Sequence, residues 1–179
     1  MNSLSQIKQA HVSQSGFALE GPARMKEFAV VGTASAGQLD VFDSDSAPEA
    51  GVYTQSGTTV TVTDSSHGLT SGDIVGIAFD AGTGGTAAPG NYEITVTSAN
   101  AFTVTVLNSI TISGGSNACR YVAYTPLSTT TPKRWVMTKE TGAGDTFQNV
   151  FQIPSGGFLA RNNVYFSMTN LGSAEVLFE

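Results

Sequence analysis

Threonine alternates strictly with valine, isoleucine or phenylalanine in several segments of this sequence, and this pattern is typical of β-strands. The pattern runs through residues 58–63 (Thr-Thr-Val-Thr-Val-Thr), 94–97 and 102–106. In a β-strand, such alternation places the apolar side chains on one face and the threonines on the other. β-Branched residues also suit a pleated, half-buried surface. No segment of comparable length shows helical periodicity, so we expect an all-β protein.

Short turns rich in Gly, Ser and Asn separate the apolar segments, as they do between the strands of antiparallel sheets. Strands are therefore expected at residues 25–31, 38–42, 58–63, 74–79, 92–97, 102–106, 120–124, 134–139, 146–153, 164–169 and 175–178.

The strand segments are of two kinds, which indicates two modules. The Thr/Val pattern is concentrated in the middle of the chain, whereas the flanking strands carry Phe, Met, Trp and Leu. We expect residues 20–49 plus 128–179 to form an antiparallel β-sandwich (jelly-roll-like). Residues 50–127 would form a second small β-barrel or sandwich domain, inserted in a loop of the first. Residues 1–19 are expected to be a polar N-terminal arm. The alternative is one larger sandwich that contains all the strands.

Composition excludes several classes of partner. Only 12% of the residues are charged, the net charge is −6, and no basic stripe is present, so we expect no nucleic-acid partner. The single cysteine, Cys119, leaves no intramolecular disulfide or cysteine-based zinc site and is expected to be a small buried apolar residue. The polar first ten residues indicate no secretory signal, and no apolar run is long enough for a membrane span.

Catalytic chemistry has few candidate residues. Asp64, Ser66 and His67 supply the residue types of a nucleophilic triad, but they are too close in sequence for its geometry. The other histidine, His11, lies in the polar arm. A glycosidase would need paired carboxylates in an aromatic cleft, and Glu93 and Glu140 lack that context. The large aromatic residues are instead expected in the core or in interfaces: Trp135, Phe147, Phe151, Phe158 and Phe166. We expect no enzyme.

Candidate ligand sites are also weak. Residues 82–87 (Gly-Thr-Gly-Gly-Thr-Ala) match a dinucleotide fingerprint by letters, but a strand follows where the fingerprint needs a helix. Three aspartates cluster at 40–45 without the spacing of an EF-hand, so a solvated acidic loop is favoured over Ca²⁺ binding. These are Asp40, Asp43 and Asp45. Asp73 is expected to cap a turn. We expect no catalytic, cofactor-binding or metal-binding residue and no cofactor.

The middle of the chain resembles a small β-domain of bacteriophage tail and head-fibre proteins, the FCCH-like domain. The matching residues are 67–75 (HGLTSGDIV), 90–96 (GNYEITV) and 101–104 (AFTV). The resemblance implies a structural module and carries no catalytic residues.

The ends of the chain resemble small virion proteins of tailed bacteriophages, including marine and cyanobacterial phages. The shared features are residues 21–26 (GPARMK), 31–43 (VGTASAGQLDVFD), 153–158 (IPSGGF), 164–170 (VYFSMTN) and 174–178 (AEVLF). The two ends of the chain match these virion proteins and the middle does not. This difference also favours the interpretation that the middle is an inserted domain.

These resemblances imply a bacteriophage virion structural protein, most simply a capsid decoration or cement protein that binds and stabilises the major capsid shell. The expected partners are the major capsid protein or other virion proteins and further copies of the chain, with no nucleic acid and no membrane. The expected location is the virion. A tail, neck or fibre component involved in assembly or host attachment is the alternative. A small hydrolase or lyase on a β-scaffold is the hypothesis from another class.

Overall fold

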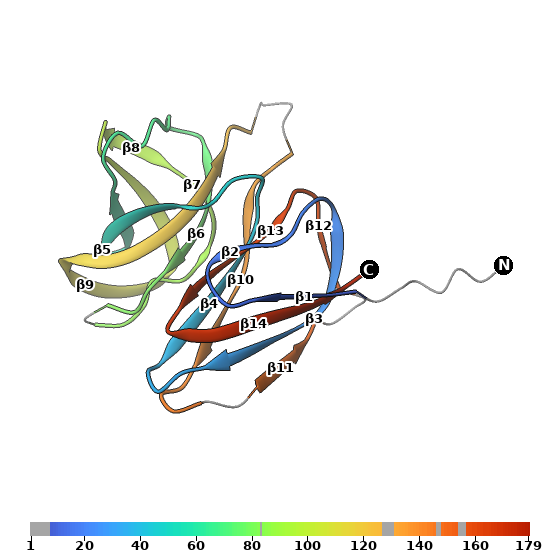
Figure 1. Cartoon of the computed structure of the whole chain (residues 1–179). Helices are drawn as coiled ribbons and strands as arrows, with labels where there is room; N and C mark the ends of the chain where they lie inside the picture. Colours follow the sequence, from blue (N-terminus) through green and yellow to red (C-terminus); the bar gives the residue numbers. More distant parts are fainter. Residues whose placement is uncertain (1–7, 83, 127–130, 146–147, 154–156) are drawn as a thin grey trace. The chain divides into compact units, whose positions relative to one another are not determined.

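The computed structural model describes residues 8–82, 84–126, 131–145, 148–153 and 157–179. These residues form fourteen β-strands and no helix, and the strand pairs whose register the structure defines are all antiparallel (Figure 1). The expected all-β, antiparallel sandwich class is therefore confirmed. No helix able to span a bilayer occurs in the described part of the chain.

The chain divides into two compact units. Unit 1 comprises Met1–Asp45 and Thr138–Glu179, and unit 2 comprises Ser46–Met137. The middle of the chain thus folds on itself while its two ends fold together. The predicted middle domain, residues 50–127, begins later and ends earlier than unit 2. That unit 2 is an inserted domain stays a prediction.

The first sheet of unit 1, which we call sheet A, combines the two ends of the chain. Its strand order is β1 (Lys8–Val12), β14 (Leu171–Phe178), β3 (Ala23–Gly32) and β11 (Gln148–Gln152). The short strand β12 (Phe158–Ala160) also pairs with β3. The edges of sheet A are therefore β1 on one side and β11 with β12 on the other.

The second sheet, sheet B, has the order β10 (Arg134–Thr141), β4 (Gly37–Asp43), β13 (Val164–Thr169) and β2 (Gly16–Leu19). It belongs to unit 1 except for the first four residues of β10, which fall in unit 2. Fully buried apolar side chains of both sheets form the core of the sandwich. They include Met25, Phe28, Val30 and Val176 of sheet A and Leu39, Val41, Val164 and Phe166 of sheet B.

The residues expected to form a polar N-terminal arm, 1–19, contain two paired strands, β1 and β2. β1 pairs with β14 from Lys8↔Phe178 to Val12↔Ala174, and β2 pairs with β13. The polar composition of this segment hid its strands, because β1 and β2 lie at sheet edges, where half of the backbone and most side chains face water. Residues 1–7 lie outside the described residues.

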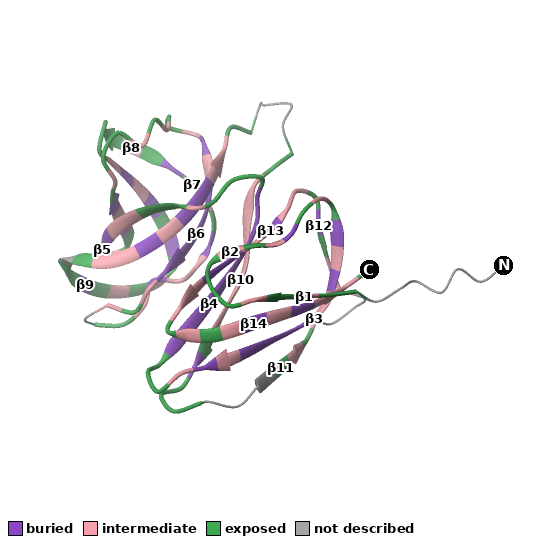
Figure 2. Ribbon diagram, viewed as in Figure 1, coloured by how far each residue is buried: buried purple, intermediate pink, exposed green. Residues whose placement is uncertain are grey.

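Unit 2 is one curled sheet with the order β5 (Glu49–Thr63), β9 (Ala101–Tyr124), β6 (Ile74–Phe79) and β7 (Gly90–Glu93). The strand β8 (Thr95–Ser98) also pairs with β9. The predicted placement of apolar residues and threonines on opposite faces of these strands is confirmed. The apolar side chains fill the core, and the intervening threonines are exposed or half-buried (Figure 2). The buried members include Val60, Val62, Phe102, Val104 and Val106.

Two details of unit 2 differ from the expected strands. The segments 102–106 and 120–124 are parts of one long strand, β9, because β5 pairs with both of its halves across two register shifts. The expected strand at 92–97 is interrupted at Ile94. There the N–H of Ile94 donates to Asp73 O (3.0 Å), and the Ile94 carbonyl accepts from Gly72 N (3.0 Å).

Candidate functional site

The His67 turn is built from hydrogen bonds in which Asp64, Ser66 and His67 each have a separate partner. His67 Nδ1 accepts the N–H of Leu69 (3.0 Å), so Nε2 carries the proton and donates to Ser98 O (3.1 Å). Asp64 Oδ2 accepts the Tyr121 hydroxyl (2.6 Å), and Ser66 N donates to Asn100 Oδ1 (2.9 Å). These contacts fix a turn, and neither nitrogen of His67 is left to activate a nucleophile.

Tyr121 and Asp64 form the tightest polar contact of this region. Burial raises the pKa of the Tyr121 hydroxyl, and the hydrogen bond to Asp64 raises it further. Tyr121 therefore stays protonated and acts as a fixed donor to the carboxylate. The pair anchors the end of β5 to β9, which is a structural role.

Shallow hollows surround the His67 turn. Three of them, of about 360, 190 and 180 Å³, share His67 in their lining. The most polar is lined by Glu49, Asp64, Ser65, Ser66, His67 and Tyr121. Carboxylate, hydroxyl and imidazole groups at one place suit a hydroxyl-rich ligand. The hollows are open, and no cluster of three metal-ligating side chains occurs among the described residues.

Asp73 caps a turn, as the sequence predicted. Its Oδ2 accepts the N–H (2.9 Å) and the hydroxyl (3.1 Å) of Thr70, and its Oδ1 accepts the Thr125 hydroxyl (2.8 Å). Burial by itself raises the pKa of the Asp73 carboxyl, but these hydrogen bonds favour the charged form and outweigh burial. The net pKa of Asp73 lies below its ordinary value.

The expectation of a solvated acidic loop at residues 40–45 is wrong for two of the three aspartates. Asp40 is 1% exposed and accepts hydrogen bonds from Gln38 Nε2 (2.9 Å) and the Thr138 hydroxyl (2.6 Å). Asp43 is fully buried and accepts the backbone N–H groups of Arg161 and Asn162. Buried carboxylates need such donors. Only Asp45 is exposed.

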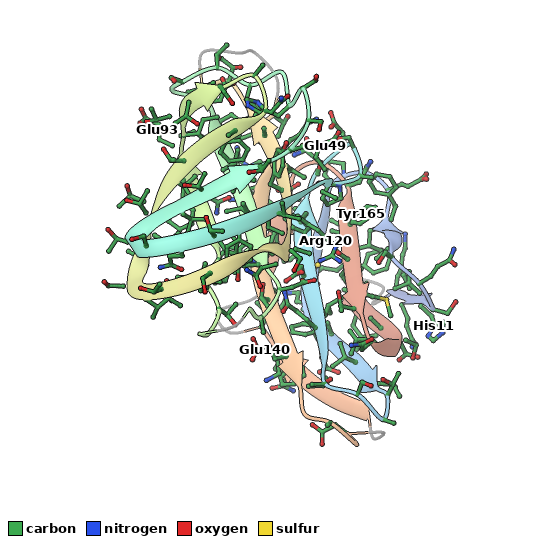
Figure 3. The ribbon with its side chains drawn as sticks, turned by 90° about the vertical axis from the view of Figure 1, so that its left-hand side faces the viewer. His11, Glu49, Glu93, Arg120, Glu140 and Tyr165 are labelled. Carbon is green, nitrogen blue, oxygen red and sulfur yellow. The ribbon has the colours of Figure 1, made fainter. Side chains whose placement is uncertain are left out.

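The remaining sequence candidates do not assemble into a site. Gly82 and Gly85 exchange backbone hydrogen bonds in a tight turn, and the chain continues into β7 with no helix in its described residues. Glu93 lies in unit 2 and Glu140 in unit 1, on exposed strand positions (Figure 3). Because the two glutamates belong to different units, they do not form a pair of carboxylates within one unit, as a glycosidase site would need. Phe147 lies outside the described residues. Phe166 is in the core, and Trp135 is half-buried.

A surface that the sequence did not reveal lies on the outer face of sheet A. Its apolar centre is Ala29, Val150 and Leu177, and it surrounds a hollow of about 160 Å³. Register places these residues together, because Ala29 pairs with both Val150 and Glu175, and Leu177 pairs with Glu27. We call this the sheet A surface. Its polar edge is formed by Gln9, Glu27 and Glu175.

The polar edge of the sheet A surface is partly ordered by the N-terminal strand. Gln9 Nε2 donates to Glu175 Oε2 (2.9 Å), and His11 Nδ1 lies 3.2 Å from Glu175 Oε1. His11 thus has a structural partner in β14. The sequence does not reveal this surface, because it depends on the pairing of β1, β3, β11 and β14. This pairing brings residues from both ends of the chain onto one face.

No family model, no curated protein and no solved structure matches this chain. What the fold and the described surfaces establish is an antiparallel β-sandwich protein with a second β-unit.

Proposed function

We propose that this chain is a structural protein of the tailed-bacteriophage virion, specifically a decoration or cement protein that binds and stabilises the capsid shell. The sequence support is the resemblance of both the middle and the ends to phage structural proteins. The structural support is the sheet A surface, which is the observation that carries the proposal.

The sheet A surface has the composition of a protein-binding patch. Val150 is 53% exposed and Leu177 is half-buried, while the buried Ala29 lines the hollow between carboxylates at its edge. An apolar centre within a polar rim is the usual anatomy of a protein interface. The occupant in this proposal is the major capsid protein, which would contribute an apolar side chain to the hollow and a basic group to Glu27.

Unit 2 suits the solvent-facing part of such a protein. Its strands present exposed, uncharged hydroxyl side chains at Thr59, Thr63, Thr95, Thr97 and Thr105. A neutral hydroxyl surface attracts few charged partners. In this proposal, unit 1 attaches the protein and unit 2 remains in solvent.

A tail, neck or fibre component is the second candidate, favoured by one observation. The hollows at His67 combine carboxylate, hydroxyl and imidazole groups, which suit the hydroxyl groups of a host glycan. A glycan bound there would favour host attachment over decoration of the shell.

The attachment surface can be tested with Leu177→Lys. Binding of purified protein to capsids that lack it would be measured by co-sedimentation. We expect at least a tenfold loss of affinity, because a lysine in the apolar centre must be desolvated. Thr105→Lys, an exposed position in unit 2 with the same charge change, is the control and should bind normally. Equal binding by both variants would rule out the sheet A surface as the attachment site.

A further inference from the structure

Sheet A ends at β11, whose outer edge has no strand partner within the described part of the chain. The backbone groups on that edge can be assigned from register. Ile153 N donates to Lys26 O (2.9 Å), and Gln152 pairs with Glu27. Along two antiparallel strands, residue pairs that are joined by backbone hydrogen bonds alternate with pairs that are not. Because Ile153 and Lys26 are a hydrogen-bonded pair, the pairs at 152, 150 and 148 are not hydrogen-bonded. The N–H and C=O groups of residues 148, 150 and 152 therefore point away from β3, toward the open edge.

This edge lacks the features that normally prevent strands from pairing between molecules. Charged residues, prolines and bulges are the usual protection. β1 carries Lys8 and His11, β10 carries Lys139 and Glu140, and the pairing of β2 contains a register shift. β11 reads Gln-Asn-Val-Phe-Gln, has no charge or proline, and keeps an unbroken register with β3.

β11 is also held firmly on its inner side. The Phe151 ring stacks on Phe28, with centroids 5.2 Å apart and an interplanar angle of 27°. Lys139 Nζ lies 4.1 Å from the centre of the Phe151 ring. Because Phe28 is only 2% exposed, these contacts tie β11 to the core. The open edge is thus pre-organised for pairing, which lowers the entropic cost of binding.

We propose that two copies of this chain pair through β11, antiparallel and related by a two-fold axis at Val150. The strand is self-complementary in this register. Residue 150 lies opposite its own copy, and Gln148 lies opposite Gln152 of the second copy, so all outward backbone groups find partners. No like charges meet. Val150, which is 53% exposed, would pack against its symmetry mate on the outer face.

A second copy of the chain is the favoured partner of β11, because the strand is uncharged and its sequence is nearly palindromic. Two copies of the strand can therefore pair with each other, and no different strand is needed. This inference does not depend on capsid binding. A single five-residue ladder is smaller than the roughly 1,000 Å² interface of a stable complex, so the free dimer would be transient. On a shared surface, where copies are concentrated, the same contact would become effective.

A disulfide trap makes a transient dimer measurable. In the proposed register the Cα atoms of residue 150 and its mate are about 5.5 Å apart, within disulfide range. Purified full-length Val150→Cys would be mildly oxidised and its dimer formation timed on non-reducing gels. The native Cys119 does not interfere, because it is buried and burial raises its thiol pKa to about 12.

Two control variants distinguish the proposed register from other contacts between copies. Gln152→Cys lies on the same edge, but its two copies would be about 14 Å apart in this register. Leu107→Cys lies in unit 2, at a large apolar side chain that is 89% exposed. We expect Val150→Cys to cross-link at least tenfold faster than either control. Equal rates for all three, or a faster Gln152→Cys, would overturn the proposal. Circular dichroism would verify that each variant is folded.

Discussion

At the residue scale, several polar side chains of this protein stabilise turns and loops through hydrogen bonds to the backbone. Asp73, Asp43 and His67 each accept backbone N–H groups that strand pairing leaves free. Such bonds are worth more when the acceptor is charged. The same residue types that suggested chemistry in the sequence are therefore used for structure.

Asp73→Asn should destabilise the protein by about 1–3 kcal/mol at neutral pH, because the amide cannot replace both carboxylate oxygens as acceptors. The folded-state pKa of Asp73 is lowered from 3.8, so its stabilisation is present above 3.8 and is lost as the pH falls through the lower folded value. The difference in unfolding free energy between wild type and variant should therefore shrink at pH well below 3.8. Denaturant titrations at both pH values measure it. A difference that is independent of pH would contradict this role of the charge.

At the element scale, the close approach of β6 and the first residues of β10 depends on one glycine. A Cβ on Gly76 would collide with the backbone of Arg134 and Trp135. Asn91 completes this contact, since its Oδ1 accepts from Trp135 N (2.9 Å) and its Nδ2 donates to Trp135 O (3.0 Å). The Asn91 side chain thus acts as a substitute for a paired strand.

Gly76→Ala should lower the free energy of unfolding by about 1–3 kcal/mol, because the obstructing atoms are backbone and move only with the strand. Gly16→Ala in β2 is the matched control, since a Cβ there meets nothing within 4 Å. Thermal denaturation of the two variants would compare them. Equal melting temperatures would show that residues 134–135 are not held against β6.

The sequence predicted the strands whose alternation is local, and missed what depends on distant partners. Val60 and Val62 are buried between exposed or half-buried threonines, as their period requires. The burial of Asp43 was not foreseeable, because its donors lie at Arg161 and Asn162. β9 continues through a Gly- and Ser-rich segment that resembles a turn, since β5 pairs on both sides of it.

The candidate surface was harder to predict than the strands. Val150 and Leu177 gave no signal in the sequence as neighbours, because only the register of β11, β3 and β14 brings them onto one face. The expected absence of catalytic, metal and cofactor sites stays a prediction, as does the virion location.

At the scale of the whole molecule, the proposed protein acts by binding to the capsid shell. Unit 1 combines the two ends of the chain and carries both the sheet A surface and the open edge of β11. A decoration protein uses such surfaces many times over, because the capsid shell repeats its binding site by symmetry. Abundance in the particle therefore separates the two proposed locations.

The number of copies of this chain per particle distinguishes a capsid decoration protein from the alternatives. Quantitative mass spectrometry of purified virions that encode it would give the ratio of this chain to the major capsid protein. A capsid decoration protein predicts hundreds of copies, in a fixed ratio to the shell. A few copies per particle would contradict decoration and favour the tail or neck, and absence from purified virions would contradict a structural role.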